Sequence, residues 1–451
     1  MYEKKQEKAY SIISLLLPAI VIFGHYKFVD IRVLGVPLNF VRVLIPSLFL
    51  ILTIKRVKNK NKQDEYGHNE ITILCILAIW IAYGLFTLFK MPYADPHFGL
   101  LEISSLVLGI MIISILMILC KHDNWDYIVL GIKVCIVITI IIAVYEIVTA
   151  RHLSISRYSD PSFISEVKKF YGNNMHMLKR HVATTVFYNE NDYSAFLAIV
   201  TPFLIATEKE NSKAKWYFNL IVFCFAFAVL YFNNAFICFV AFALGLIVVL
   251  TFGYNTMYKR AEIIGALIIT RVLVHFLEKA AGLDLSMGNT LYAQLGNNGV
   301  GSMARRLYTY KIVFRETFIT SKGLGFGAGS FTNYFGRVGQ KGTILLDPHC
   351  FWLEILSKYG IVIFILFTGV LMRIMILLIR RCVILNDARC IPVIASGLSM
   401  IVASVAPSSF INFGYYWIPI AMAVFLIDIP SNTGDEIKSL DSSGLNSLYN
   451  E

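Results

Sequence analysis

Long apolar blocks alternate with short polar segments along almost the whole chain. A helix needs about 20 predominantly apolar residues to cross the hydrocarbon core of a bilayer. Twelve blocks reach or approach that length, at residues 9–24, 40–54, 70–90, 99–120, 126–148, 182–206, 216–232, 236–252, 261–277, 350–372, 391–406 and 414–428. The shortest of them fit tilted or broken helices. The pattern therefore predicts an all-α polytopic membrane protein with about 12 transmembrane helices.

Composition supports this class. The chain has 451 residues, of which 57% are hydrophobic and 15% are charged. An average soluble domain is about 45–50% apolar and about 25% charged. We expect a single transmembrane domain over residues 1–428, with a large outer loop at 278–348, and a disordered cytoplasmic tail at 429–451. The eight cysteines form no CxxC pair and no zinc-ligand spacing, so we expect no metal site.

Lysine and arginine in the short loops predict the direction in which each block crosses the membrane. Short cytoplasmic loops are enriched in these residues. Segment 55–62 carries five of them, 207–215 three, 253–260 two and 373–389 four, whereas 91–98, 233–235 and 407–413 carry none. Both termini are then expected to be cytoplasmic.

The two long loops at 149–181 and 278–348 then lie outside, where long loops escape this charge rule. Each carries a net charge of +4, out of +11 for the whole chain. The excess is compatible with solvated loop charge, with attraction to anionic lipid headgroups, or with an anionic substrate at the outer face. Nucleic acid is not an expected partner, because the sequence contains no soluble basic domain.

The second long loop contains the clearest candidate chemistry. In residues 302–318, apolar side chains recur at helical spacing, which predicts an amphipathic helix on the membrane surface carrying Arg305 and Arg306. Alone, two such arginines fit lipid headgroup contacts. Alternating glycines follow, including Gly325 and Gly327. Their backbone N–H groups could bind a phosphate, although a plain flexible turn is equally compatible.

A helix start is predicted just after this segment. Asp347 is a suitable cap and Pro348 suits the first helical position, which puts His349 in the first turn. A lone histidine at an interface is usually structural. Polar residues also enter the apolar blocks at Asn191, in block 182–206, and at Glu354, in block 350–372. Buried polar side chains of this kind mark either a functional interior or hydrogen bonds between helices.

Three stretches, taken in order, carry a resemblance to a known family. Arg180 precedes residues 184–187 and Asn189-Glu190-Asn191, where the family has Arg, Gly-Thr-Phe and Asn-Pro-Asn. Arg306 and Tyr310 precede the glycines of 323–327, as in the pattern Arg, aromatic, Gly-x-Gly-x-Gly. His349, Leu353 and Gly360 match His-Asn-x-x-Leu followed by Gly. The chain thus resembles the O-antigen polymerase and ligase superfamily, and most closely its Gram-positive teichuronic-acid and capsule polysaccharide polymerases.

The resemblance implies a metal-independent, cofactor-free glycosyltransferase of the GT-C architecture in the bacterial cytoplasmic membrane. It would transfer glycan from an undecaprenyl-diphosphate-linked repeat unit to a growing extracellular polysaccharide at the outer face. His349 would be the catalytic base. The diphosphate and glycan would contact Arg180, Arg306, Arg305, Asn191, Gly325, Gly327 and Glu354. Implied partners are lipid-linked oligosaccharide donor and acceptor and membrane lipid, with a flippase and a chain-length regulator as further candidates.

The chain departs from the family pattern at several positions. Asn233-Asn234-Ala235 stands where relatives often have Ser-Arg, which leaves Arg180, Arg157 or Arg305 to hold phosphate instead. Cys350 replaces the asparagine after the histidine. Within the class, a ligase that moves finished glycan to another acceptor is the alternative. Outside it, the alternative is a flippase for lipid-linked oligosaccharides, although neither repeats nor clearly broken helices are evident.

Overall fold

The computed structural model describes residues 2–24, 32–33, 36–59, 67–122, 124–171, 181–206, 212–254, 257–280, 302–338, 349–407 and 411–429. These residues are almost entirely helical, apart from one short antiparallel hairpin, β1 (Arg32–Val33) with β2 (Val36–Pro37). The helices are α1 (Tyr2–Phe23), α2 (Phe40–Asn59), α3 (His68–Lys90), α4 (Pro96–Lys121), α5 (Trp125–Thr149), η2 (Arg157–Ser159), α6 (Pro161–Tyr171), α7 (Glu190–Val200), α8 (Pro202–Ile205), α9 (Lys213–Phe232), α10 (Phe236–Phe252), α11 (Met257–Ala280), α13 (Ser302–Ile319), α14 (Phe331–Val338), α15 (Phe351–Leu385), α16 (Cys390–Ala403), η4 (Gly414–Tyr416) and α17 (Trp417–Asp428).

Every apolar block singled out in the sequence contains a helix. Within the described residues, five helices are long and apolar enough to cross a membrane: α3, α4, α5, α9 and α15. Three further apolar elements are shorter, namely α10, α16 and η4 with α17. The all-α prediction is confirmed and the helices fit a membrane protein. Twelve crossings and a GT-C architecture remain predictions.

Two of the predicted spans differ from the observed helices. The block 182–206 is helical only from Glu190, because residues 181–189 are held as an irregular loop. The Glu146 carboxylate accepts backbone N–H groups from Thr184 and Thr185, each at 2.7 Å. These bonds replace the ones a helix would make. The block 350–372 belongs to α15, which continues to Leu385 and is interrupted at Gly360, where φ is 78° and ψ is 179°.

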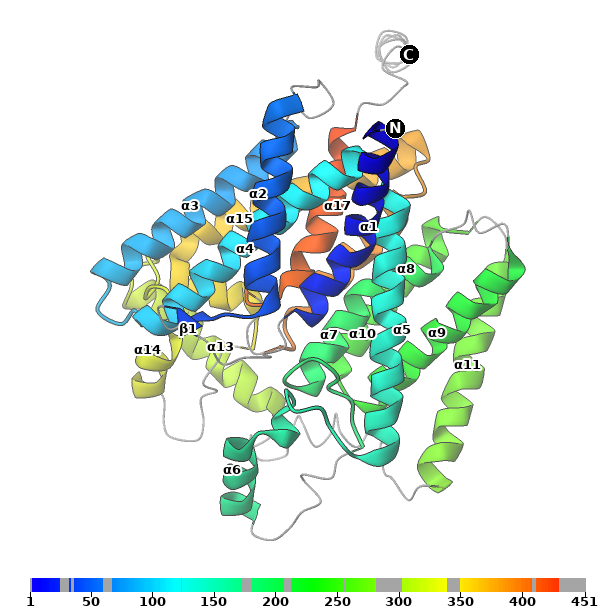
Figure 1. Cartoon of the computed structure of the whole chain (residues 1–451). Helices are drawn as coiled ribbons and strands as arrows, with labels where there is room; N and C mark the ends of the chain where they lie inside the picture. Colours follow the sequence, from blue (N-terminus) through cyan, green and yellow to red (C-terminus); the bar gives the residue numbers. More distant parts are fainter. Residues whose placement is uncertain are drawn as a thin grey trace, which may run out of the picture.

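The helix predicted at 302–318 is confirmed as α13, and its place on the membrane surface stays a prediction; α14 was not predicted. The hydropathy of α4 explains its central place. It is apolar all round, its mean hydropathy is 2.8, and 78% of its span is buried. A helix that lacks a polar face has to be covered on all sides by others. α17, α2 and α3 supply much of that cover (Figure 1).

The bundle has two chemically different ends. At one end Glu70 meets Arg56 at 3.4 Å and Lys121 at 3.0 Å, and its backbone N–H donates to Asp428. This end therefore gathers the start of α3 and the ends of α2, α4 and α17. α6, α13 and α14 lie toward the opposite end (Figure 1). The described parts of the two long loops are thus remote from the end of α2 and the start of α3, and which end faces outward stays a prediction.

Candidate active site

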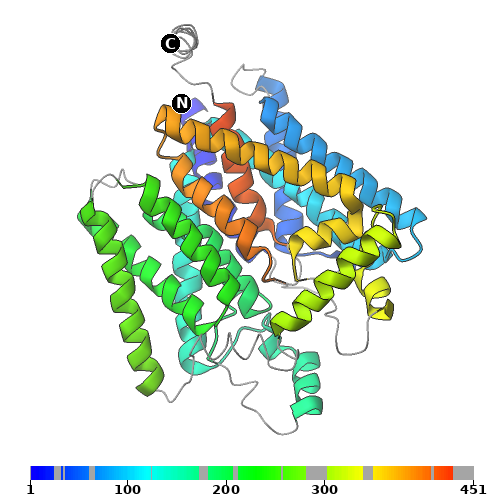
Figure 2. The ribbon, with the colours of Figure 1, turned by 180° about the vertical axis from the view of Figure 1, so that it is seen from behind.

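Three separate segments of the chain meet around His349. Arg306, on α13, donates from Nη1 to the Val405 carbonyl oxygen at 3.3 Å, just past the end of α16. Tyr310, one turn further along α13, donates its hydroxyl to the His349 carbonyl oxygen at 3.1 Å. Figure 2 shows α13 beside the start of α15 and the end of α16. The histidine and one arginine named from the sequence are therefore brought together.

The environment of the His349 ring favours neutral imidazole. Burial lowers its pKa to about 4, and the positive charges of Arg306 and Arg157 act in the same direction. A hydrogen bond to the Ala406 backbone opposes the shift only in part. A neutral imidazole can accept a proton, as a general base must.

The start of the following helix differs from the prediction. α15 begins at Phe351 and its N-cap is Cys350, with φ −160°. His349 has φ 45°, so it lies outside the helix rather than in its first turn. Such a positive φ is uncommon for a residue with a side chain. Asp347 and Pro348, on which the predicted cap rested, fall outside the described residues.

A second polar group lies at the start of α7. Arg157 Nη2 contacts Glu190 Oε1 at 2.5 Å and donates to the Tyr158 hydroxyl at 2.9 Å. Asn189 caps the helix: its side-chain oxygen accepts the backbone N–H groups of Asn191 and Asp192, and its amide donates to Asp192 Oδ2 at 2.8 Å. Two acidic side chains are thus buried beside one arginine. Charges placed in this way need partners or a wet cavity.

Several buried polar atoms in this region lack partners among the described residues. They are His349 Nδ1, Arg157 Nε and Asp192 Oδ1. Burying an unsatisfied polar atom costs about 1–3 kcal/mol, so proteins rarely leave such atoms without a role. The unsatisfied set contains one donor, Arg157 Nε, and two acceptors, the unprotonated His349 Nδ1 and Asp192 Oδ1. It is suited to a polar ligand that carries both hydroxyl and anionic groups.

The glycine-rich segment uses its N–H groups inside the protein. Gly325 donates to Ser321 Oγ at 3.0 Å and Gly327 donates to the Lys358 carbonyl at 2.9 Å. Both glycines have positive φ, 81° and 98°. A Cβ on Gly325 would lie 2.7 Å from the Lys358 carbonyl oxygen and from the Gly360 nitrogen. The glycines therefore permit close backbone packing against the break in α15.

Glu354 belongs to a buried ion cluster beside that break. Lys358 Nζ contacts Glu354 Oε1 at 2.7 Å and Glu102 Oε1 at 2.5 Å. The other Glu102 oxygen accepts the Tyr359 hydroxyl at 2.8 Å and the Gly329 N–H at 3.1 Å. The cluster ties α4, α15 and the glycine-rich segment together. Charged residues inside the apolar blocks 99–120 and 350–372 could have indicated this cluster, but neither Glu102 nor Lys358 was predicted as a site residue.

An apolar groove begins close to His349. It runs between α15, α16 and α17, has a volume of about 500 Å³, and is lined by apolar side chains that include Trp352, Leu371, Met375 and Ile401. Trp352 lies near the start of α15, and its Nε1 donates to the Ile401 carbonyl oxygen at 3.2 Å. The groove could take a long hydrocarbon chain whose polar end lies at His349.

The remaining predicted site residues are placed as follows. Arg180 is outside the described residues. Arg305 precedes Arg306 in α13, and only its backbone is described. Asn191 is the second residue of α7, where it is partly buried. Asn233, at the position of the family Ser-Arg pair, bonds Ala183 through both its oxygen and its nitrogen, so it anchors the loop before α7. Arg157 is the alternative arginine that the structure brings to the site.

Comparison with known proteins gives one informative similarity. No protein-family model matches the chain. The chain is 24% identical over 453 residues to the teichuronic acid biosynthesis protein TuaE of Bacillus subtilis. The similar region covers 92% of this chain and 85% of that protein. The similarity therefore extends over most of the chain.

Proposed function

We propose that the chain is a membrane glycosyltransferase that polymerises lipid-linked glycan for a bacterial polysaccharide. The main support is that Arg306 and His349, from two of the three stretches that carry the family resemblance, lie close together. Arg157, which contacts Glu190 at the start of α7, is close enough to act on the His349 ring. Similarity to a teichuronic acid biosynthesis protein supports the broader role in polysaccharide biosynthesis. The five long apolar helices agree with a lipid-linked substrate.

His349 is the base in the proposed reaction. The ring bonds the Ala406 backbone, and Nδ1 has no partner among the described residues. The acceptor hydroxyl oxygen forms a bond to the anomeric carbon of the donor as its proton passes to Nδ1. The bond from that carbon to the diphosphate breaks, and its electron pair leaves on the diphosphate oxygen. General-base catalysis of this kind contributes about 10²–10⁴-fold.

Arg306 binds the departing diphosphate in this proposal. Its guanidinium lies partly buried beside His349, and charge-assisted contacts in such surroundings are about twice as strong as neutral ones. Arg180 and Arg305 remain proposed contributors, and Arg157 adds positive charge from the α7 side. Gly325 and Gly327 support the site indirectly, because they let the glycine-rich segment pack against α15. Glu354 also supports it indirectly, because it pairs with Lys358 in the buried ion cluster.

The polyprenyl chain occupies the apolar groove between α15 and α16. The groove starts at Trp352, three residues after His349, so a diphosphate at the arginine would extend its lipid into the groove. Asn191 and Asp192 lie on the other side, at the start of α7, and are suited to hydroxyl groups of the glycan. This arrangement keeps the lipid and sugar parts of the donor apart.

Incubation of the purified protein with undecaprenyl-diphosphate-linked repeat units tests the proposal. Chain growth with release of undecaprenyl diphosphate is the expected result. A single transfer to a different acceptor would show a ligase, and movement of the donor across a bilayer without transfer would show a flippase. Either result would overturn polymerase activity.

A matched variant ties the activity to the site. His349→Ala should abolish chain growth, whereas His275→Ala, on α11, should retain it. The His275 side chain is 48% exposed and lies 3.5 Å from Glu278 on the same helix. Equal losses in the two variants would indicate a general structural effect and remove the support for His349 as the base.

A further inference from the structure

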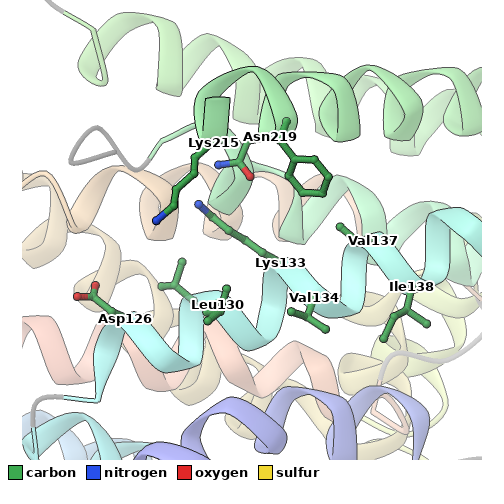
Figure 3. Close-up of a pocket in the computed structure, with 10 residues that line it drawn as sticks. Asp126, Leu130, Lys133, Val134, Val137, Ile138, Lys215 and Asn219 are labelled. Carbon is green, nitrogen blue, oxygen red and sulfur yellow. The ribbon is translucent and has the colours of Figure 1, made fainter. Parts of the chain in front are cut away.

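A second groove lies at the end of the bundle away from His349. It runs between α5 and α9, has a volume of about 630 Å³, and is lined by Asp126, Val129, Leu130, Lys133, Val134, Val137, Ile138, Lys215, Phe218 and Asn219. Figure 3 shows the side chains of Lys133 and Lys215 reaching toward its mouth from the two helices. The groove combines two positive charges with an otherwise mostly apolar lining.

Lys133 occupies an unusual depth for a charged residue. It lies about 12 Å along α5 from the start of that helix, at 1.5 Å per residue. α5 has a mean hydropathy of 2.8 and is one of the helices fit to cross a membrane. Charged side chains inside such helices are costly and mark sites of interaction.

The apolar side chains of α5 that line the groove are exposed on the outer surface of the helix bundle. Leu130, Val134 and Ile138 recur at every fourth residue of α5 and are 47%, 44% and 40% exposed. Phe218 on α9 is 54% exposed beside them. Exposed apolar residues at this spacing form a continuous strip about 12 Å long. A lipid acyl chain can lie along such a strip, with its headgroup at the lysines.

The positive charge of the two lysines favours an anionic lipid over a neutral one. Lys133 and Lys215 provide two ammonium groups, and Arg389 is close enough to interact with the charge of Asp126 at the rim. An ammonium group binds phosphate as a compact point charge. The groove shares no lining residue with the groove beside Trp352, so the two are separate.

We propose that the groove between α5 and α9 binds an anionic glycerophospholipid, with its phosphate between Lys133 and Lys215 and one acyl chain along Leu130, Val134 and Ile138. This site is independent of the proposed transferase activity. Binding there would join α5 to α9, two helices that flank the segment 181–206, without contact with donor or acceptor.

Native mass spectrometry of the full chain in neutral detergent tests this proposal. The protein is mixed with equal amounts of phosphatidylglycerol and phosphatidylcholine, and retained lipid is counted. Phosphatidylglycerol should be retained preferentially. The double variant Lys133→Gln with Lys215→Gln should retain about tenfold less, since each lysine loses a charge-assisted contact. Lys213→Gln, an exposed lysine on the same helix that does not line the groove, should change retention little.

A third variant separates the groove from general surface attraction. Val134→Phe fills the floor and leaves both lysines, so it should also reduce phosphatidylglycerol retention. Equal retention of the two lipids, or retention unchanged in both groove variants, would overturn the site. Preferential retention of undecaprenyl phosphate over phosphatidylglycerol would overturn the assigned lipid class. Thermal unfolding of each variant confirms that the protein tested is folded.

Discussion

Two buried polar clusters in this protein differ in how their charges are arranged. Lys358 contacts the carboxylates of Glu102 and Glu354, and Glu102 also accepts a hydroxyl and a backbone N–H. Around His349, Arg306 donates only to backbone carbonyl oxygens among the described residues, and the imidazole Nδ1 has no hydrogen-bond partner there. The first cluster contains opposite charges in contact, whereas the second sets the positive charges of Arg306 and Arg157 near a neutral ring.

The difference separates a structural role from a functional one. A cluster whose charges are paired within the protein fixes the helices that carry it, because removing one partner leaves the others buried without compensation. A cluster with unsatisfied atoms can be completed by a substrate. Substitutions in the first cluster should therefore lower stability, and substitutions in the second should lower activity at nearly constant stability.

The largest expected effect is the loss of the base. His349→Ala should lower the rate of glycan transfer by about 10²–10⁴-fold, measured with purified protein and a lipid-linked donor. The amount of folded protein should stay near that of the unmodified chain, since His349 has an unsatisfied nitrogen to begin with. His349→Gln keeps hydrogen bonding without accepting a proton in this pH range. Full activity of the glutamine variant would reduce His349 to a hydrogen-bonding residue.

The next effect should appear in the paired cluster. Lys358→Met leaves Glu102 and Glu354 buried without their shared cation, which should cost about 3–5 kcal/mol of stability. Thermal unfolding in detergent measures this loss. The triple variant Glu102→Gln, Lys358→Met and Glu354→Gln removes all three charges and should recover part of the stability. If Lys358→Met unfolded like the unmodified protein but lost transfer activity, the cluster would belong to the site.

A smaller effect is expected when the arginine charge is kept. Arg306→Lys retains one positive charge but cannot make two parallel contacts to phosphate. We expect transfer to fall by about tenfold, the cost of one lost charge-assisted contact. Arg315→Lys, more exposed and paired with Glu316 on the same helix, serves as the matched control. Unchanged rates in Arg306→Lys would contradict the assignment of Arg306 to the diphosphate.

The pH dependence of the reaction should show whether the His349 ring is neutral in the folded protein. The pKa of His349 is lowered to about 4, below its ordinary value of 6.5, first by burial and then by Arg306. In the unfolded chain the histidine gains its proton near pH 6.5, so its contribution to stability is present at neutral pH and is lost as pH falls from 6.5 toward 4. Because the ring in the folded protein stays neutral down to about pH 4, the kcat/KM profile should lack an acidic limb near pH 6.5. A limb at pH 6.5 that disappears in His349→Gln would contradict the buried, neutral ring.

How far the sequence predicts the fold and the site depends on the range of the forces involved. Helix positions follow from local apolar pattern, and α13 was predicted from the spacing of its own residues. The loop before α7 was not predicted, because its backbone N–H groups bond the side chains of Glu146 and Asn233, which are distant in sequence. The same holds for the partners of Glu354 and for the packing of Gly325 against α15, which depend on contacts between remote segments.

The smallest expected effect concerns Cys350, the residue between His349 and the first residue of α15. It is the N-cap of α15, and only its sulfur, a weak acceptor, faces the backbone N–H groups of Trp352 and Leu353. Asparagine is among the most favourable N-cap residues, and its side-chain oxygen would accept the backbone N–H of the residues two or three positions on. Cys350→Asn should therefore raise stability by about 0.5–1 kcal/mol and leave transfer nearly unchanged. Thermal unfolding should show the increase, with Cys350→Ala as a control that lacks the acceptor. If the asparagine variant instead changed the transfer rate while the alanine variant did not, position 350 would contact substrate. The substrate site around His349 would then extend to the N-cap of α15.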